Sequence, residues 1–248
     1  MLYINDKKVT PTIFPDKTSQ VWNLDPLLFK ERHWAVTWQF EGEGEIMHLA
    51  QIRALAENSR ITCSLVLPYL PYGRQDKDVG NEATFALHSF SDMVNALVFR
   101  EVIIMDPHSQ VAVDRIMRSL ADYPISKVSA VFEECGASMV CYPDEGAAKK
   151  YTKIYPFRSI VYGQKKRDFM DGAILSYEIM GNSARQSVLI VDDICDGGAT
   201  FIRLAGLLKA QDVKEIHLFV THGIFSKGLQ VLRDAGIQRI FTKEGEQS

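Results

Sequence analysis

The chain has 248 residues, which is enough for one large or two small α/β domains. Its net charge of −3 argues against a protein that coats nucleic acid, and no apolar run approaches the roughly 18–20 residues that cross a bilayer. The N-terminal residues lack the apolar core of a signal peptide, and the four cysteines lack the CxxC spacing of zinc ligands. We therefore expect a cytoplasmic protein with reduced thiols that binds neither nucleic acid nor a membrane.

The first half of the chain alternates predicted strands and helices. Short apolar alternations over residues 1–23 predict a hairpin or meander, with a turn at residues 14–18. Strands are expected at residues 35–40, 61–67 and 101–105, with helices at 45–58 and after residue 81. Pro68 and Pro71 end the second of these strands. They place residues 68–77 in a loop at its C-terminal end, where open α/β sheets bind ligands.

The second half follows the same plan after a boundary at residues 120–127. We predict a helix at 128–134, a strand at 138–141, a turn and helix over 142–150, and strands at 157–162, 173–179, 188–191 and 214–220; residues 163–168 form a basic loop. Strands that alternate with helices imply parallel sheets covered on both faces. The fold class is therefore α/β, with two similar doubly wound domains over residues 1–122 and 123–248.

Residues 188–200 are the most informative stretch. Four apolar residues predict a buried strand, and Asp192 and Asp193 follow where it should end. A turn of small residues and a helix over 201–209 come next, which is the arrangement of an anion site, because backbone N–H groups and the helix N-terminus attract phosphate. The two carboxylates would take ribose hydroxyls or waters on a Mg²⁺ ion. The alternative is a plain strand-to-helix turn with a capping aspartate.

This stretch resembles the phosphoribosyl-binding loop of type I phosphoribosyltransferases and of phosphoribosyl pyrophosphate (PRPP) synthetases. Gly197 stands where that loop usually has threonine, and Ala199 where it has glycine. Further motifs are similar to those of PRPP synthetases and occur in the same order, at residues 68–77 (with Arg-Gln-Asp), 105–108 (Asp-Pro-His), 142–146 (Pro-Asp-Glu-Gly), 165–167 (Lys-Lys-Arg) and 221–226 (Thr-His-Gly-Ile-Phe-Ser). Together they make a chance resemblance improbable.

The resemblance implies a type I phosphoribosyltransferase-like fold and a Mg²⁺-dependent enzyme. It would move the β,γ-diphosphoryl group of ATP to the anomeric hydroxyl of ribose 5-phosphate. Residues 1–122 would be the ATP-binding half, with Phe14, Asp16, Arg74, Gln75, Asp76, Lys77 and His108. Residues 123–248 would bind the ribose phosphate through Asp144, Asp192, Asp193, Asp196, Gly197, Gly198, Ala199 and Thr200. It further implies catalysis by Lys165, Arg167 and His108, with Mg²⁺ ligands His108 and Asp144.

The basic triplet suits a mobile loop that closes over the transferring group, with Lys166 facing solvent. The chain departs from the family in its short length and in residues 14–18, where the usual glutamate is missing and the role of Thr18 stays open. Because that turn reaches a neighbouring subunit's ATP in the family, we expect a homo-oligomer, a dimer or a hexamer. The short form is reminiscent of proteins that phages and some bacteria encode beside NAD-salvage enzymes, so the compartment would be the host cytoplasm for a phage protein.

Alternative functions stay open beside PRPP synthesis. Without a side chain at Gly197, the loop could admit a phosphate that carries a further group, which makes ADP-ribose the main rival acceptor to ribose 5-phosphate. A catalytically silent subunit is a second alternative, against which Arg74, His108, Lys165 and Arg167 argue. A phosphoribosyltransferase is a third, but that class has no reason to keep the Arg-Gln-Asp loop.

Overall fold

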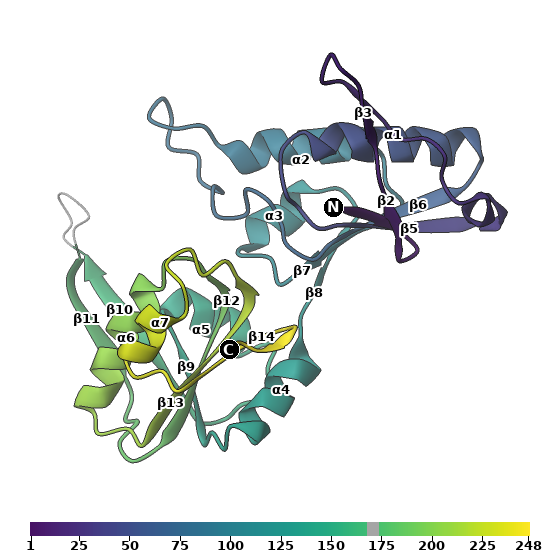
Figure 1. Ribbon diagram of the computed structural model, residues 1–248. Coiled ribbons are helices and arrows are strands. Elements are labelled where there is room, and N and C mark those ends of the chain that lie inside the picture. Colours follow the sequence, from purple (N-terminus) through teal and green to yellow (C-terminus); the bar gives the residue numbers. More distant parts are fainter. Residues whose placement is uncertain (168–173) are drawn as a thin grey trace. The chain divides into compact units, whose positions relative to one another are not determined.

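The structure, a computed structural model, describes residues 1–167 and 174–248, and only the backbone of residues 165–167, 174 and 175 (Figure 1). The chain divides into two compact units, Met1–Asp122 and Tyr123–Ser248. Each unit is an α/β domain built around a twisted sheet that is mainly parallel. Among the described residues, none of the helices is both long and apolar enough to cross a membrane.

In unit 1, whose residues are all described, the main sheet has the strand order β2-β1-β5-β6-β7-β8. Strands β5 to β8 are parallel, and β1 joins β5 in antiparallel register, with Leu2 opposite Trp38. The elements of its sheet are β1 (Leu2–Ile4), β2 (Lys7–Val9), β5 (His33–Trp38), β6 (Thr62–Leu67), β7 (Val102–Met105) and β8 (Ser119–Asp122). The remaining elements are β3 (Thr12–Ile13), β4 (Ser19–Gln20), the 3-10 helix η1 (Pro26–Lys30), α1 (Glu45–Asn58), α2 (Ala86–Ala96) and α3 (Gln110–Arg115).

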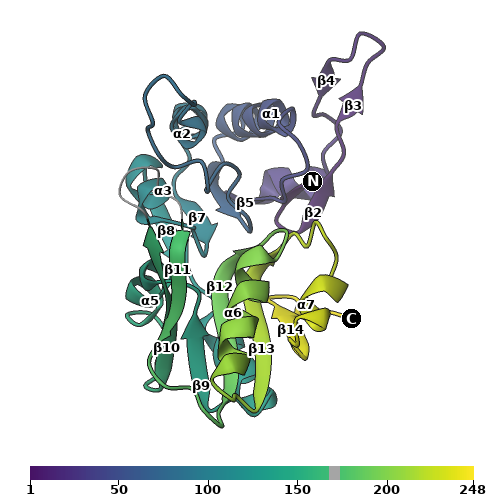
Figure 2. The same ribbon diagram turned by 90° about the vertical axis from the view of Figure 1, so that its left-hand side faces the viewer.

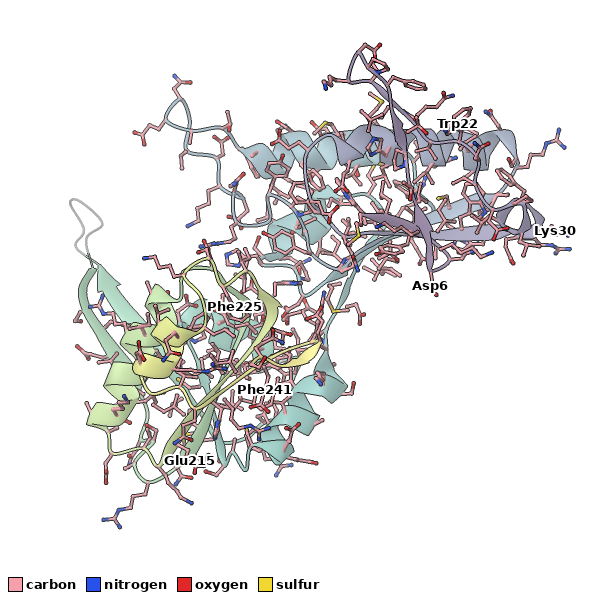
Figure 3. All side chains as sticks on the ribbon, viewed as in Figure 1. Asp6, Trp22, Lys30, Glu215, Phe225 and Phe241 are labelled. Carbon is pink, nitrogen blue, oxygen red and sulfur yellow. The ribbon has the colours of Figure 1, made fainter. Side chains whose placement is uncertain are left out.

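Strands β3 and β4 form a small hairpin outside this sheet (Figure 2). The hairpin is attached to α1, because the Gln51 side chain bonds to both Ser19 and Val21, and His48 bonds to the Ser19 hydroxyl at 2.7 Å. Trp22, at the base of the hairpin, is 49% exposed (Figure 3). The turn of this hairpin therefore extends from the helix-covered side of unit 1.

In the described part of unit 2, the sheet has the strand order β11-β10-β9-β12-β13-β14-β15. Its five inner strands are parallel, and β11 and β15 are antiparallel at the two edges. The strands are β9 (Met139–Tyr142), β10 (Ile160–Arg167), β11 (Ile174–Met180), β12 (Ser187–Cys195), β13 (Glu215–Gly223), β14 (Arg239–Thr242) and β15 (Gly245–Glu246). The helices are α4 (Ile125–Glu134), α5 (Glu145–Tyr151), α6 (Ala199–Ala210) and α7 (Gln230–Asp234).

Two expectations about the strands of unit 2 were wrong. The apolar run at residues 188–191 was expected to end the strand, but β12 continues to Cys195 because β13 pairs with it as far as Gly223. The basic triplet was expected in a loop, but its backbone lies in β10, where β11 pairs with residues 162–167 in antiparallel register. The sequence also gave no signal for β8, which lies in the expected boundary between the halves.

Each unit has its own hydrophobic core. In unit 1 the core includes Trp34 and Trp38, and in unit 2 a core on each face of the sheet is built on the alternating residues of β12. All four cysteines are free and buried, namely Cys63, Cys135, Cys141 and Cys195. Burial raises the pKa of the Cys63 and Cys195 thiols to about 12, and the prediction that the cysteines are buried is confirmed.

Candidate functional site

Two adjacent carboxylates lie near the C-terminal end of β12. Asp192 and Asp193 are consecutive residues of this strand, and their side chains interact with each other. Asp193 is 5% exposed, whereas Asp192 is half-buried, and the backbone N–H of Asp193 donates to Asp192 Oδ1 at 3.0 Å. Burial, reinforced by the charge of Asp193, raises the pKa of Asp192 well above its usual range. Hydroxyl or cationic partners would therefore be strongly favoured at this position.

The turn after β12 leads directly into α6. Gly198 is the N-cap residue and has a left-handed backbone with φ of +77°, which glycine adopts without strain. It brings no side chain to cap the first turn of α6, and a Cβ at this position would lie 2.8 Å from Leu232. The first N–H groups of this twelve-residue helix thus face the turn that residues 196–198 form, as an anion site requires.

The loop after β13 packs against this turn. The backbone N–H groups of Ile224 and Phe225 donate to the Cys195 carbonyl at 2.9 and 3.1 Å, and the Ser226 hydroxyl donates to Asp196 Oδ1 at 2.6 Å. Glu215 and Phe225 mark the two ends of this part of the chain, at opposite ends of the sheet of unit 2 (Figure 3). The Thr-His-Gly-Ile-Phe-Ser motif therefore supports the Asp-Gly-Gly-Ala-Thr turn through hydrogen bonds.

Asp144 follows β9, the neighbour of β12 in the sheet. It is the N-cap residue of α5, and its Oδ1 accepts from the Ala147 N–H at 2.9 Å. Because β9 and β12 are parallel and in register, with Ile190 opposite Cys141, Asp144 lies at the same edge of the sheet as Asp192. Unit 2 thus gathers all its predicted ribose-phosphate residues at the C-terminal edge of β9 and β12.

The predicted ATP-binding residues of unit 1 follow the adjacent strands β6 and β7. Arg74 and Gln75 are exposed, and the turn that carries them is closed by the Gln75 N–H, which donates to the Tyr72 carbonyl at 2.9 Å. Tyr72 itself has a left-handed φ of 61°. His108 is exposed in the segment between β7 and α3. Asp76 and Lys77 follow in the same loop as Arg74. The predicted residues after β6 and β7 therefore all lie at the C-terminal edge of the sheet of unit 1.

Phe14 and Asp16 lie in the turn of the β3–β4 hairpin. Phe14 is 37% exposed, and the Thr18 hydroxyl donates to Asp16 Oδ1 at 2.7 Å. This hydrogen bond, with a second from the Thr18 N–H, lowers the pKa of Asp16. The Thr18 hydroxyl therefore has its hydrogen-bond partner within the turn. The hydrogen bonds at the base of the hairpin attach the hairpin to α1.

The side chains of Lys165 and Arg167 lie outside the described residues, although their backbone is described. β10 and β11 are anchored at Gly163, where a Cβ would meet the Pro143 carbonyl oxygen at 2.5 Å. The absence of a side chain there lets the Tyr177 hydroxyl reach that carbonyl, to which it donates at 2.5 Å. The strand that carries the basic triplet is thereby connected to the loop of Asp144.

Comparisons with known proteins agree on one family. Residues 158–245 match the phosphoribosyl transferase domain. Ribose-phosphate pyrophosphokinases from Pyrococcus abyssi and Mycoplasmopsis pulmonis are each 25% identical, over 77% and 92% of this chain and 68% and 73% of their own lengths. The Mycoplasma genitalium protein of the same name is 30% identical over 72% of this chain, which spans 55% of it.

The phosphoribosylpyrophosphate synthetase of Mycobacterium smegmatis has the same fold, with a TM-score of 0.74 over 95% of this chain and 79% of that structure, at 18% sequence identity. The chain is therefore a relative of the PRPP synthetases. The expected fold is thereby confirmed, and members of this family are enzymes. The chain spans only part of the length of each of these relatives.

A metal site made of protein ligands alone is not found among the described residues, since no three His, Cys, Asp or Glu side chains converge there. Mg²⁺ commonly takes one or two carboxylates and completes its shell with waters and substrate phosphates. The hard carboxylate oxygens of Asp144 and Asp192 have this donor chemistry. The residues present in this PRPP synthetase relative therefore fit a Mg²⁺ ion that arrives with a phosphorylated substrate.

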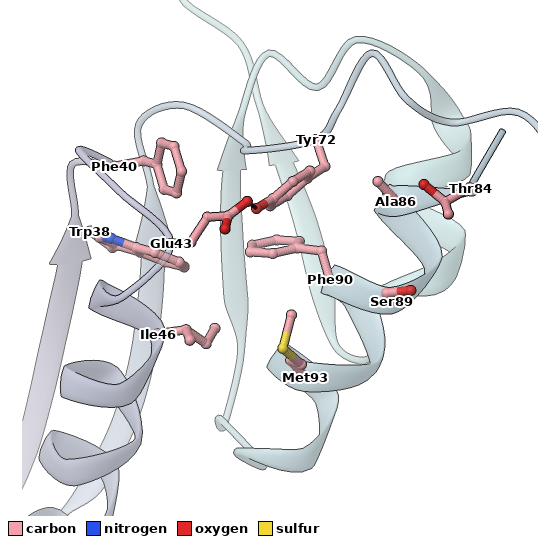
Figure 4. Close-up of a pocket in the computed structure, with 10 residues that line it drawn as sticks. All are labelled: Trp38, Phe40, Glu43, Ile46, Tyr72, Thr84, Ala86, Ser89, Phe90 and Met93. Atoms are coloured by element: carbon pink, nitrogen blue, oxygen red, sulfur yellow. Dashed lines mark hydrogen bonds between the residues drawn. The ribbon is translucent and has the colours of Figure 1, made fainter.

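Unit 1 also has a pocket that the sequence did not predict (Figure 4). It has a volume of about 420 Å³, and the rings of Trp38, Phe40, Tyr72 and Phe90 line it between α1 and α2. The Tyr72 hydroxyl donates to Glu43 at 2.6 Å at its rim, which raises the pKa of Tyr72 to about 12. Because Tyr72 also belongs to the loop of Arg74, the pocket borders the predicted ATP-binding segment of this PRPP synthetase relative.

Proposed function

We propose that the chain transfers the β,γ-diphosphoryl group of ATP to the anomeric hydroxyl of ribose 5-phosphate, and yields PRPP and AMP. The observation that supports this most is the edge of unit 2, where Asp144, Asp192 and Asp193 lie beside an uncapped helix N-terminus. Hydroxyl-binding carboxylates next to a phosphate-binding turn are the two halves of a ribose-phosphate site. The similarity to ribose-phosphate pyrophosphokinases supports the same reaction.

In unit 2, the turn at residues 196–200 would hold the 5-phosphate through backbone N–H groups and the Thr200 hydroxyl. The carboxylates of Asp192 and Asp193 would accept hydrogen bonds from the ribose hydroxyls. These contacts fix the sugar so that its anomeric oxygen can approach the β-phosphorus, which is how positioning lowers the barrier to phosphoryl transfer.

In unit 1, Arg74 would bind phosphate oxygens through its planar guanidinium, and Gln75 and His108 would bind further groups of ATP. The anomeric oxygen forms a bond to the β-phosphorus, the bond from that phosphorus to the AMP oxygen breaks, and the hydroxyl proton is released. Lys165 and Arg167 would neutralise the charge that develops on the transferring group. Mg²⁺, when bound, would neutralise phosphate charge; in unit 2 the carboxylates of Asp144 and Asp192 offer oxygen ligands for it, and in unit 1 His108 is the proposed ligand.

ADP-ribose is the second candidate acceptor. Its ribose presents the same anomeric hydroxyl, but its 5-phosphate is esterified to a second phosphate. Gly197 supports this candidate, because nothing lies closer than 3.5 Å to the position where its Cβ would be. A phosphoribosyltransferase and a silent subunit are less well supported, since neither needs the exposed Arg74 of unit 1.

The product mixture tests the proposal. Purified protein is incubated with ATP, Mg²⁺ and either ribose 5-phosphate or ADP-ribose, and the nucleotides are separated by chromatography. Formation of AMP with a stoichiometric diphosphorylated acceptor supports the diphosphokinase, and the ratio of kcat/KM values ranks the two acceptors. ADP as product, or no acceptor-dependent AMP with either sugar, would overturn it.

The raised pKa of Asp192 predicts a pH dependence of acceptor binding. Ribose hydroxyls donate to the ionised carboxylate, so protonation of Asp192 as the pH falls should raise the KM of the acceptor. The measurement is the acceptor KM between about pH 5 and pH 8, where the second ionisation of a phosphate near pH 6 also contributes. Asp192→Asn should remove the part of this pH dependence that comes from the Asp192 carboxylate. An unchanged pH profile in this variant would contradict the assignment.

Homo-oligomerisation, as a dimer or a hexamer, remains a proposal of its own. It rests on the exposed Phe14 and Trp22 of the hairpin, which solvent would otherwise surround. Light scattering that gives the mass of a monomer for a fully active sample would contradict it.

A further inference from the structure

Lys227 lies against the phosphate-binding turn, although no motif drew attention to it. A Cβ placed on Gly197 would lie 3.5 Å from both Cδ and Cε of Lys227, and 3.8 Å from its Cγ. The methylene chain of the lysine therefore runs alongside the one residue of the turn that leaves this space open. Its ammonium group is one bond beyond Cε and therefore lies close to the same turn.

The position of Lys227 is fixed by its neighbours. Ser226, the preceding residue, is bonded to Asp196 of the turn, and the Phe225 N–H is bonded to the Cys195 carbonyl. Gly228, the following residue, has a left-handed φ of 74° and donates its N–H to the Phe225 carbonyl at 2.7 Å. The lysine is thus held between two anchored residues and is not at the tip of a long loop.

The charge balance of this edge favours a cation at Lys227. Asp192, Asp193 and Asp196 place three carboxylates near a turn that is proposed to hold a phosphate dianion. Backbone N–H groups and a helix N-terminus contribute only partial charge. Among the described residues, no carboxylate pairs with the exposed Lys227 ammonium, so it is available to a ligand.

Arg203 is the other basic residue near the start of α6. Its guanidinium carbon lies 5.4 Å from the centre of the ring of Tyr177, a residue of β11. The positive charge of a cation stacked on an aromatic ring is already attracted by the negative face of that ring. Lys227 is therefore the better placed of the two cations for an anion at Gly197.

We propose that Lys227 binds the phosphate that the acceptor carries on its ribose 5-position, and that its ammonium occupies the space beside Gly197. The proposal rests on the proposed function of the same site. The ligand chemistry is a phosphoryl anion next to Gly197. It can be the terminal phosphate of ribose 5-phosphate or the second phosphate of a 5-diphosphate such as that of ADP-ribose.

The test compares Lys227→Ala and Lys227→Arg with Lys214→Ala in the full chain. Lys214 is also exposed and lies just before β13, at the opposite end of the sheet, so it matches the charge change without touching the site. Binding of ribose 5-phosphate and of ADP-ribose is measured by calorimetry without ATP, together with the KM values for acceptor and ATP. Lys227→Ala should weaken acceptor binding by about 10- to 100-fold, the usual effect of losing a charge-assisted hydrogen bond. The KM for ATP should stay unchanged.

The two acceptors and the three variants distinguish the possible results. Loss of affinity for both acceptors supports a contact with the first phosphate, and loss for ADP-ribose alone supports a contact with the second. Lys227→Arg should retain most of the affinity, and Lys214→Ala all of it. Equal acceptor affinities in Lys227→Ala and the unmodified chain would overturn the proposal for Lys227. If the unmodified chain itself bound neither acceptor, the proposed function would fail instead.

Discussion

Lys165→Ala and Arg167→Ala should each lower kcat by about 10²- to 10³-fold, the usual effect of removing one donor that stabilises transition-state charge. In the proposed reaction the β-phosphorus of ATP is attacked while negative charge increases on its oxygens, and both residues belong to the basic triplet that is proposed to neutralise this charge. Neither change removes a residue of the described hydrophobic cores. The measurement is single-turnover formation of AMP, with thermal unfolding recorded in parallel.

Lys166→Ala is the matched control for this experiment. It removes the same charge from the same strand, and the sequence assigns it to solvent. We expect turnover within about two- to threefold of the unmodified chain, which is small beside the loss of a catalytic donor. Near-normal turnover in both the Lys165 and the Arg167 variants would show that the basic triplet has no catalytic role.

Gly198→Ala should disrupt both stability and acceptor binding. Alanine in the left-handed region costs about 1–2 kcal/mol, and the new Cβ would approach Leu232 to 2.8 Å, so that either α7 or the turn must shift. Because Gly198 determines how the turn enters α6, we also expect the KM of the acceptor to rise about tenfold or more. Urea unfolding measures the first effect and steady-state kinetics the second.

Gly206→Ala provides the contrast within the same helix. Gly206 is exposed in the middle of α6, and a Cβ there meets nothing within 4 Å. Alanine should stabilise the helix by about 0.5–1 kcal/mol and leave the KM of the acceptor unchanged. A Gly198 variant as stable and as active as the Gly206 variant would refute the importance of the left-handed turn.

The sequence predicted where the loops of the candidate sites lie better than it predicted the lengths of the strands. Apolar runs and breaking prolines indicate where a strand lies, so the loops of Arg74 and Asp144 were located correctly at strand ends. Polar residues within a strand carry no such signal. Asp192 and Asp193 belong to β12 because β13 supplies their hydrogen-bonding partners, and that partner is distant in sequence.

The basic triplet and Lys227 illustrate the same limit. Lys165 to Arg167 have the composition of a solvated loop, and only pairing with β11 makes them a strand. Lys227 reaches Gly197 through a loop that follows the next strand of the sheet. Contacts between segments about thirty residues apart depend on the order of strands in the sheet, which neither composition nor periodicity specifies.

The buried cysteines give the two units separate chemical reporters. Cys63 is in unit 1, whereas Cys135, Cys141 and Cys195 are in unit 2, and burial keeps the thiols protonated and inaccessible in the folded state. An alkylating reagent can therefore react with each unit only when that unit opens. Mass spectrometry of the labelled peptides would give two opening rates from one unmodified chain. Because Cys195 adjoins the turn that is proposed to bind phosphate, slower labelling of this residue alone would report ligand binding without any assay of turnover.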